Sequence, residues 1–479
     1  MATKLAGKKM LIAGEWEERE DKIEVYNPEN NELIDTVPAA KAADIEKAIA
    51  LAKQGAKVAS DLSIRDRMNV LNKAASFIEK NIDKFATTIA LEGSKTINEA
   101  RSETARAAET LRLSAEEARR LNGESINFDQ MPGQEDRMGY YFRFPVGVVA
   151  AITPFNDPLN LVAHKLGPAI AAGNAVILKP AAQTPLSALK LAEALMNAGL
   201  PKKILTVITG RGRDIGDTLV ESKDVQMISF TGGLETGEQI AKKAGLKKLS
   251  MELGSNSPVI IRKDADLNLA ADAAASGAFS AAGQNCLSVQ RIFIEEDVYE
   301  VFKEAFLKKV KKLKVGHKLS ESTDMGPLIN EKEAIRVENW IREAVSMGGT
   351  VLRGGTRKGA YLEPTVLEHV PEKATIVKEE VFGPAVMLFK VKSLDEAIER
   401  ANNVNYGLQA GIFTANINSA LKAAKKLHVG GVMVNDSSDF RIDAMPFGGV
   451  KGSGLGREGV AFAIREMSEE RIVGFKLTE

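Results

Sequence analysis

Short apolar runs alternate with helical patterns along the middle of the chain. Four runs are almost continuously apolar: 146–152, 175–179, 204–208 and 227–230. Strands of this kind are buried on both faces, and their alternation with helices, as at 185–197 and 214–221, predicts a parallel sheet covered on both sides. Ligands of such sheets bind beyond the carboxyl ends of the strands. Four residues fall at those ends: Asn156, Lys179, Gly232 and Glu252.

A second α/β pattern begins after Ser257 and Pro258. Its predicted strands are 258–261, 290–294, 385–391 and 430–435, and its predicted helices are 297–313, 331–348 and 393–402. Ahead of both units, short strands and turns over 10–40 precede predicted helices at 41–58, 65–85 and 96–121. We therefore expect an α/β protein with two doubly wound parallel-sheet domains and an active site in the cleft between them.

The bulk composition gives no reason to expect several classes of partner. A chain of 479 residues is long enough for more than one domain. Lys+Arg and Asp+Glu both number 64, so the net charge gives no reason to expect nucleic acid or an anionic membrane as a partner. We expect no membrane span, because no apolar run is long enough, and no secretory signal, because residues 1–9 lack an apolar core. The four histidines show no metal-ligand spacing, so no metal site is expected.

Cys286 is the only cysteine, which excludes an internal disulfide framework and favours a reducing, cytoplasmic location. It follows the small-residue run 273–283, which predicts a helix ending at Gly283 and a thiol in a loop facing a cleft. Glu252 lies between two apolar residues at the end of a strand-like run, where a carboxylate is paired, protonated or functional. Together these groups suggest covalent catalysis with a general base. Taken singly, they also fit a buried structural cysteine and a helix N-cap or surface carboxylate.

The sequences Met251-Glu252-Leu253-Gly254 and Gly283-Gln284-Asn285-Cys286 resemble the glutamate and cysteine signatures of the aldehyde dehydrogenase superfamily. Glu252 and Cys286 are 34 positions apart, also as in that family, and the resemblance covers almost the whole chain.

The resemblance implies a particular domain organisation. Residues 1–122 and 143–254 would form a Rossmann-like dinucleotide-binding domain, and 255–464 a catalytic domain. Residues 123–142 and 465–479 would form a small β oligomerisation arm, and hence a homodimer or homotetramer.

The family resemblance assigns catalytic roles. Cys286 would attack an aldehyde to give a thiohemiacetal, hydride would leave to a nicotinamide, and Glu252 would activate water against the resulting thioester. Thr153-Pro154-Phe155-Asn156 looks like the family's oxyanion motif, in which Asn156 donates its side-chain amide. The residues alone also fit a turn asparagine between Pro154 and Pro158.

Two further motifs resemble the family's cofactor site. The stretch from Phe230 to Gly237 looks like its dinucleotide loop, with Gly232 and Gly237 at the two glycine positions and Gly233 in place of a common serine. Glu379-Glu380-Val381-Phe382 resembles the motif in which Glu380 holds the nicotinamide ribose and Phe382 backs the ring. Phe382 also fits an ordinary core position. Gly210, Gly212 and Gly216 do not have the spacing of a Rossmann glycine loop.

A departure from the family pattern concerns the choice of cofactor. Many NAD-using relatives have a glutamate at the position of Ala182, where it binds ribose hydroxyls and repels a 2′-phosphate. Ala182 removes that repulsion, and Lys179 can hold a phosphate as a point charge. We therefore expect NADP to be accepted and preferred, with NAD possible. Arg211 is a second candidate phosphate ligand, with a surface arginine as the alternative.

By its position in the chain, the segment 435–441 corresponds to the family's substrate loop. Its sequence looks most like that of the lactaldehyde and phosphonoacetaldehyde branch. That branch handles small polar or anionic aldehydes, and Arg106 and Arg441 could bind an anionic tail. For either arginine, a surface salt bridge is the alternative. Asn285 replaces the arginine of phosphonate-handling relatives, which argues against a phosphonate. Asn285 and Phe440 are the remaining predicted substrate contacts.

Three alternatives stay open at this point. A coenzyme-A-acylating aldehyde dehydrogenase tends to lack the glutamate found here at 252. A Cys–Glu–Lys amidohydrolase would use Cys286, Glu252 and Lys179 without a nucleotide. A non-catalytic protein on the same scaffold would not need Cys286, Glu252 and Asn156 together.

Overall fold

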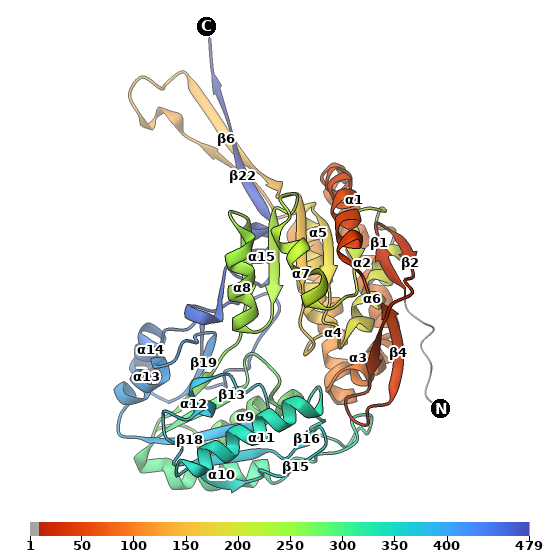
Figure 1. Cartoon of the computed structure of the whole chain (residues 1–479). Coiled ribbons are helices and arrows are strands. Elements are labelled where there is room, and N and C mark those ends of the chain that lie inside the picture. The colour runs from red at the N-terminus through yellow and green to blue at the C-terminus, as the bar shows by residue number, and fades with distance from the viewer. Residues whose placement is uncertain (1–8, 479) are drawn as a thin grey trace.

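A computed structural model describes residues 9–478. The first eight residues and residue 479 are not described, so the expected lack of a secretory signal and the start of the range 1–122 lie outside the described part. The two predicted sheets lie in two separate layers, and a slender β-ribbon projects from the molecule (Figure 1).

The first sheet has eight strands in the order β2-β1-β9-β8-β7-β10-β11-β21. Its five parallel strands are β7 (Val148–Ile152), β8 (Ala175–Lys179), β9 (Leu205–Val207), β10 (Met227–Thr231) and β11 (Lys248–Glu252). Antiparallel strands close its two edges: β1 (Met10–Ile12), β2 (Glu15–Glu17) and β21 (Gly454–Leu455). The four apolar runs of the sequence all lie in this sheet, as predicted.

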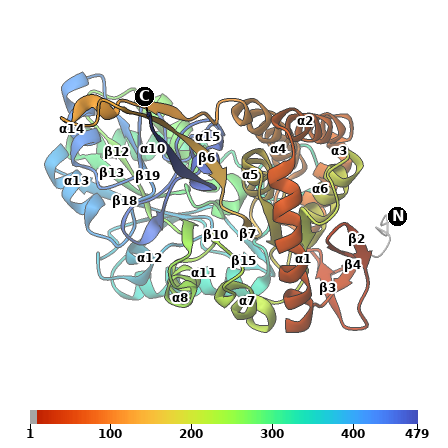
Figure 2. The ribbon, with the colours of Figure 1, turned by 90° about the horizontal axis from the view of Figure 1, so that it is seen from above.

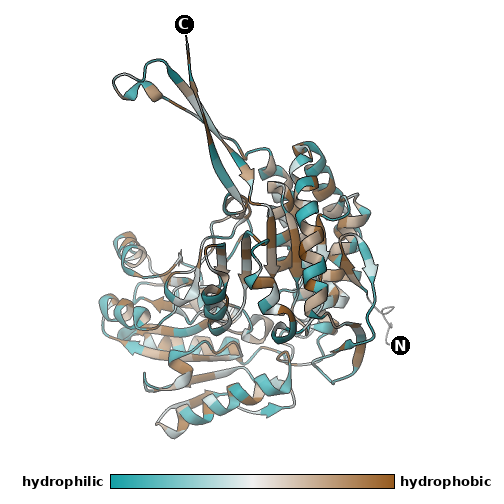
Figure 3. Ribbon diagram, turned by 45° about the horizontal axis from the view of Figure 1, so that its top comes forward, coloured by the Kyte–Doolittle hydropathy of each residue, from teal (hydrophilic) through white to brown (hydrophobic). Residues whose placement is uncertain are grey.

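Helices cover both faces of this sheet. One face packs on α2 (Ile64–Lys80), α3 (Ile82–Glu92), α4 (Ile97–Ala118), α5 (Asn160–Ala172) and α6 (Pro185–Asn197). The other face packs on α1 (Ala42–Asp61), α7 (Gly212–Glu221) and α8 (Leu234–Ala244). Val149 and Ala151 point to the first core whereas Val148 and Ala150 point to the second, as the alternation of a strand requires. Figure 3 shows the apolar strands enclosed by helices with polar outer faces.

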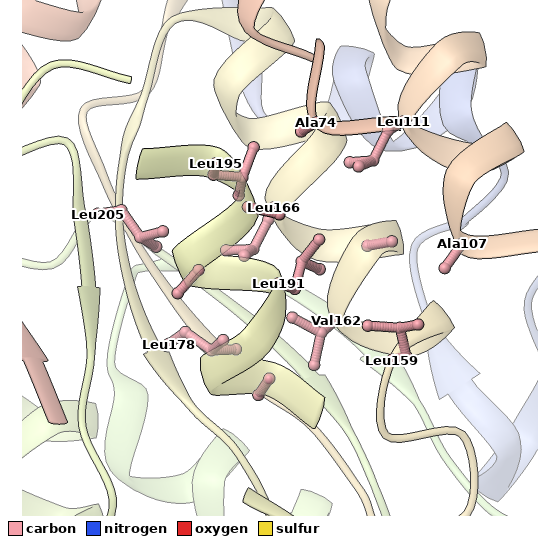
Figure 4. Close-up of a cluster of buried hydrophobic side chains, with 14 of the residues drawn as sticks. Ala74, Ala107, Leu111, Leu159, Val162, Leu166, Leu178, Leu191, Leu195 and Leu205 are labelled. Carbon is pink, nitrogen blue, oxygen red and sulfur yellow. The ribbon is translucent and has the colours of Figure 1, made fainter. Parts of the chain in front are cut away.

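Leucine, valine and alanine side chains fill the first core (Figure 4). Leu166 of α5 and Leu191 of α6 are fully buried there, facing Leu178 of the sheet. The predicted helix over 65–85 is in fact two helices, because the chain breaks at Asn81 between α2 and α3. Thr96 begins α4 with a capping box to Glu99, and this sets the start of the long helix.

The second sheet has seven strands in the order β14-β17-β18-β13-β12-β19-β20. Its strands are β12 (Ser257–Ile261), β13 (Val289–Glu295), β14 (Thr350–Arg353), β17 (Thr365–Glu368), β18 (Ala385–Val391), β19 (Gln409–Phe413) and β20 (Gly431–Val434). All pairs are parallel except β14 with β17. The main helices of this domain are α9 (Leu267–Phe279), α10 (Tyr299–Val310), α11 (Glu331–Ser346), α12 (Thr375–Lys378), α13 (Leu394–Asn402) and α14 (Ile417–Lys426).

The structure differs from the predicted boundary at residue 464. Strand β21 pairs with β11 of the first sheet, and α15 (Val460–Glu466) packs in the first core through Val460 and Ile464. The chain therefore returns to the first domain at about residue 454.

The segment before Cys286 is also different from the prediction. Helix α9 ends at Phe279 and not at Gly283. Ala281, Ala282 and Gly283 then adopt positive φ angles of 52°, 55° and 69°. A run of alanines gives no sequence signal for this turn, because L-residues rarely adopt that conformation.

The projecting ribbon consists of β5 (Glu124–Ile126), β6 (Arg137–Pro145) and β22 (Ser468–Lys476). Strands β6 and β22 pair antiparallel over their whole length, from Ser468 opposite Pro145 to Lys476 opposite Arg137. Figures 1 and 2 show the ribbon reaching beyond the first sheet. The hairpins β3 (Lys22–Tyr26)–β4 (Leu33–Pro38) and β15 (Arg357–Lys358)–β16 (Tyr361–Leu362) complete the regular structure.

Candidate active site

A cleft of about 1250 Å³ opens at the carboxyl ends of the first sheet, against the second domain. Nine of the residues singled out in the sequence line it: Asn156, Lys179, Phe230, Gly232, Gly233, Glu252, Cys286, Glu380 and Phe382. They come from six different segments, so only the fold brings them together. Six other candidates do not line it: Arg106, Ala182, Gly237, Asn285, Phe440 and Arg441.

Cys286 lies in the loop between α9 and β13, just after the left-handed turn at 281–283. A side chain at Gly283 would place its Cβ 2.2 Å from the carbonyl oxygen of Gly383, so the close approach of these two segments requires glycine. The turn aims Cys286 into the cleft. Burial raises the pKa of the Cys286 thiol, while the positive charge of Arg441 lowers it and the nearby Glu380 and Glu252 carboxylates raise it further.

Glu252 ends β11 and is only 3% exposed. Neither of its carboxylate oxygens has a hydrogen-bond partner among the described residues. Burial raises the pKa of Glu252 well above its usual range, and the negative charge of Glu458 raises it further against the opposing charges of Arg441 and Lys165. A carboxylate that is desolvated, unpaired and turned to the cleft is a poised proton acceptor.

Asn156 lies in the loop after β7 and is buried at the cleft wall with Thr153, Pro154 and Phe155. The Phe155 ring meets the Phe382 ring edge-on, with centroids 5.7 Å apart. The oxyanion candidate and the nicotinamide-ring candidate thus lie on packed neighbouring segments of the same cleft.

Lys179 is a buried cation without a carboxylate partner among the described residues. Its Nζ donates to the carbonyl oxygen of Pro180 at 3.3 Å, and burial lowers its pKa to about 8. An anionic ligand that enters the cleft would stabilise this buried ammonium, which has no carboxylate partner among the described residues. Ala182 is half-buried on the same loop, where Ala181 rather than Ala182 lines the cleft.

The glycine turn between β10 and α8 fits a dinucleotide. A Cβ at Gly232 would lie 2.5 Å from the Phe230 ring, whereas Gly233 has open space around it, so the turn leaves its backbone bare toward the cleft. Gly233 is also the N-cap of α8, and a helix N-terminus favours a pyrophosphate. Gly237 acts differently, because its missing Cβ makes room for Leu253 and lets α8 lie close to the end of β11.

Glu380 is held in the cleft by the backbone N–H of Ser255, which donates to its Oε1 at 2.9 Å. Burial raises the pKa of Glu380 to about 7. Gly254 makes room for this carboxylate, since a Cβ there would lie 2.3 Å from Glu380 Oε2. These contacts fit a carboxylate that accepts hydrogen bonds from ribose hydroxyls.

The two candidate tail-binding arginines have different partners. Arg106 is engaged by Asp443, to which its Nη2 and Nε donate at 2.7 and 3.2 Å. Arg441 is almost buried and stacks on Phe447, with its guanidinium carbon 3.8 Å from the ring centroid. Its Nη2 lies 3.4 Å from Glu458, and its buried Nε has no partner among the described residues.

Phe447 joins Arg441 to the catalytic cysteine candidate. Phe447, Leu287 and Leu408 form a small apolar cluster against which Cys286 packs. Arg441 therefore stacks on a ring of the apolar cluster that also contacts Cys286. Phe440 is 46% exposed, and Asn285 contacts Cys286 through its Oδ1, which lies 3.7 Å from Sγ.

Sequence reasoning missed two buried ions next to Glu252. Lys165 Nζ lies 3.0 Å from Glu458 Oε1, and both side chains are almost fully buried. Lys165 could have been noticed as a cation inside the apolar stretch 161–172, whereas nothing around Glu458 marks it. Arg213 was also missed: it lines the cleft, and Arg211 does not.

Comparison with known proteins agrees with this geometry. The model of the aldehyde dehydrogenase family matches residues 16–473. The chain is 48% identical to a 3-sulfolactaldehyde dehydrogenase of Priestia aryabhattai, over 98% of both chains, and 42% identical to a lactaldehyde dehydrogenase of Methanococcus maripaludis, over 97% and 99%. An NADP-dependent glyceraldehyde-3-phosphate dehydrogenase of Bacillus halodurans, solved with NADP, superimposes with a TM-score of 0.96 at 38% identity over 98% of this chain and all of that one.

No described helix has the length and apolarity needed to cross a membrane. The two sheets, the shared cleft and a match along nearly the whole sequence lead to one conclusion: the chain belongs to the aldehyde dehydrogenase family and is an NAD(P)-dependent aldehyde dehydrogenase.

Proposed function

We propose that the protein oxidises a short aldehyde with an anionic tail to the carboxylic acid, with NADP as the preferred hydride acceptor and NAD as a weaker one. The observation that carries this proposal is the single cleft lined by Cys286, Glu252, Asn156 and Lys179. It supplies a nucleophile, a base, an oxyanion donor and an unpaired cation for the cofactor.

In the first half-reaction, the Cys286 thiol loses its proton to solvent and the resulting thiolate attacks the aldehyde carbon. A C–S bond forms while the carbonyl pair moves to oxygen, and the Asn156 side-chain amide and the Cys286 backbone N–H hold that oxyanion. When the oxyanion collapses, the carbon gives up a hydride, which a nicotinamide cofactor bound in the cleft would accept. A thioester remains on Cys286.

In the second half-reaction, Glu252 takes a proton from a water whose oxygen attacks the thioester carbonyl. The C–S bond breaks, the Cys286 thiolate leaves and the carboxylic acid is released. Burial and the charge of Glu458 raise the pKa of Glu252, which makes its ionised carboxylate a stronger proton acceptor. The same carboxylate argues against transfer of the acyl group to coenzyme A.

The proposal that the substrate has an anionic tail rests on Arg441. Its buried Nε, which has no partner among the described residues, lies beside the Cys286 cluster and is a donor that a ligand would satisfy. The similar 3-sulfolactaldehyde and glyceraldehyde-3-phosphate dehydrogenases are named for aldehydes with sulfonate and phosphate tails. Lactaldehyde, a short neutral aldehyde, is the weaker candidate.

The NADP preference rests on Lys179 and on Ala182. The buried ammonium has no carboxylate among the described residues to neutralise it, and no acidic side chain stands at 182 to repel a 2′-phosphate. The B. halodurans protein was solved with NADP, which supports the same assignment.

An oligomer is also proposed, as a homodimer or homotetramer formed through the projecting ribbon. The ribbon exposes apolar side chains at Met138, Phe142, Ile472 and Phe475, and an exposed apolar strand pair is a natural interface. Light scattering after size exclusion measures the assembly. A cytoplasmic location stays a prediction, based on the single unpaired cysteine.

The test of the function is a spectrophotometric assay of nicotinamide reduction. NADP and NAD are compared with sulfo-, phospho- and carboxy-tailed aldehydes, lactaldehyde and glyceraldehyde, with Cys286→Ala as the control. Turnover that is fastest with NADP and an anionic aldehyde, and absent in Cys286→Ala, is expected. Equal turnover of neutral aldehydes would contradict the tail assignment, and faster turnover with NAD the cofactor assignment.

A further inference from the structure

A second cavity of about 650 Å³ lies behind the cofactor cleft. Its walls come from inner positions of β13 and β18, the segment 372–379 around α12, Arg400 in the last turn of α13, the loop 403–406 after it, and Leu234 at the start of α8. Three residues line both cavities: Leu234, Glu379 and Tyr406. This volume lies within the usual range of about 300–1,000 Å³ for small-molecule sites.

Two arginines on the wall of this cavity contact the same aromatic ring. The carbons of the Arg291 and Arg400 guanidinium groups lie 5.4 and 5.5 Å from the centroid of the Phe293 ring. Phe293 stacks on Phe389, which also lies under Arg400 at 5.0 Å. Both cations contact this pair of rings, and the charge of Arg400 lowers the pKa of Arg291. An anion would relieve this repulsion.

Arg291 has no carboxylate partner among the described residues, although it is only 2% exposed. Its four hydrogen bonds go to uncharged oxygens: the side-chain and backbone oxygens of Asn256 and the carbonyl oxygens of Arg400 and Ala401. Burial, followed by the charge of Arg400, lowers the pKa of Arg291 to about 9. A buried guanidinium has five N–H donors, so one remains after these four bonds.

The remaining charges of the wall leave an excess of positive charge. Lys373 and Lys378 add two cations to the two arginines, against the carboxylates of Glu372 and Glu379. Glu372 binds Arg400 Nε at 2.7 Å from an exposed position, and Glu379 accepts from the Tyr406 hydroxyl at 3.2 Å. Glu396, just outside the lining, also lies 3.5 Å from Arg400 Nη1. The four cations therefore exceed the three nearby carboxylates by one charge, which favours an anionic group such as a phosphate.

We propose that this cavity is a second anion site, separate from the active-site cleft, which binds the phosphate group of a small phosphorylated metabolite between Arg291, Arg400, Lys373 and Lys378. The cavity and its charges alone support this site, so it does not depend on the substrate or the cofactor proposed above. The same site would accept free inorganic phosphate more weakly.

The test is isothermal titration calorimetry of the full chain with inorganic phosphate at constant ionic strength. The second cavity should contribute one saturable phosphate site per chain, and Lys373→Gln/Lys378→Gln should weaken binding at that site by at least about tenfold. Glu372→Gln should tighten binding several-fold, because it removes the carboxylate that competes for Arg400. A loss in one variant and a gain in the other, one residue away, would not follow from general damage to the fold.

Three control variants separate this cavity from the active site and from the exposed surface. Lys179→Ala and Arg441→Gln each remove one proposed anion contact of the active-site region and should leave the component of phosphate binding that depends on Lys373 and Lys378 unchanged. Lys308→Gln/Lys312→Gln removes two exposed lysines beside α10, outside the cavity, and should also leave it unchanged. The proposal would be overturned by loss of this binding in any of these control variants. It would also be overturned by unchanged binding in the Lys373/Lys378 variant, or by the absence of saturable binding.

Discussion

The carboxylate of Glu458 raises the pKa of Glu252, although Glu458 is itself held by Lys165 Nζ at 3.0 Å. Burial alone would raise the pKa of Glu458, but the charges of Lys165 and Arg441 lower it to about 2. Glu458 therefore remains ionised at every working pH, and its fixed negative charge makes Glu252 harder to ionise. The pair thus tunes the base proposed for thioester hydrolysis.

Glu458→Gln should move the acidic limb of the kcat–pH profile toward lower pH. The substitution removes a negative charge from beside Glu252, so ionisation of Glu252 becomes easier and its pKa falls. The base is then active at lower pH than in the wild type. Glu469→Gln, the same change at an exposed position of β22, should leave the profile in place. A shift of the limb toward higher pH would contradict the coupling.

Ala182→Glu should reverse the cofactor preference. A carboxylate at this loop would repel the 2′-phosphate near Lys179, so kcat/KM with NADP should fall at least about tenfold, whereas the value with NAD should hold or rise. Gln183→Glu introduces the same charge at the exposed next position and is the matched control. Equal losses in both variants would point to a general charge effect rather than to position 182.

Arg441→Gln should reduce kcat/KM by roughly ten- to a hundredfold for anionic aldehydes and by much less for neutral ones. This is the range of a hydrogen bond to a charged group, about 1.5–3 kcal/mol. Arg106→Gln should cost less, because Asp443 already engages that guanidinium through two hydrogen bonds. The readout is the ratio between tailed and neutral substrates, so a uniform loss for both would remove Arg441 from tail recognition.

Gly254→Ala should weaken cofactor binding by displacing Glu380. The added Cβ would lie 2.3 Å from Glu380 Oε2, a contact that moves the carboxylate away from its bond with Ser255. We expect roughly a tenfold rise in the cofactor Kd, measured by titration of intrinsic fluorescence, since Trp340 lines the cleft. In a double-mutant cycle, Gly254→Ala should add nothing to Glu380→Gln. Additive losses would show that Gly254 acts elsewhere.

Much of the fold follows from local sequence patterns. The strand predicted at 385–391 is β18, and the predicted end of the helix at Asn402 is the end of α13, since alternation and apolar runs report burial directly. The left-handed alanines 281 and 282 could not be predicted, because only the contacts of the folded loop stabilise them. The return of β21 to the first sheet is a tertiary pairing of two residues, too short to leave a pattern.

The site was predictable where a single segment carries the chemistry. Cys286, Glu252 and Asn156 stand in local motifs, and the fold places all three in one cleft. The Lys165–Glu458 pair joins positions 293 residues apart and has no local signature. The engagement of Arg106 by Asp443 is equally non-local, and it distinguishes two arginines that the sequence treats alike.

The most direct test of the central claim is mass spectrometry of Glu252→Gln after mixing with NADP and an anionic aldehyde. Removal of the base should stop hydrolysis after the hydride has left. We expect one equivalent of NADPH per active site, steady turnover slowed about 10²–10⁴-fold, and an acyl adduct mapped to the peptide containing Cys286. Undiminished turnover without an adduct, or an adduct on any other residue, would contradict the roles assigned to Glu252 and Cys286.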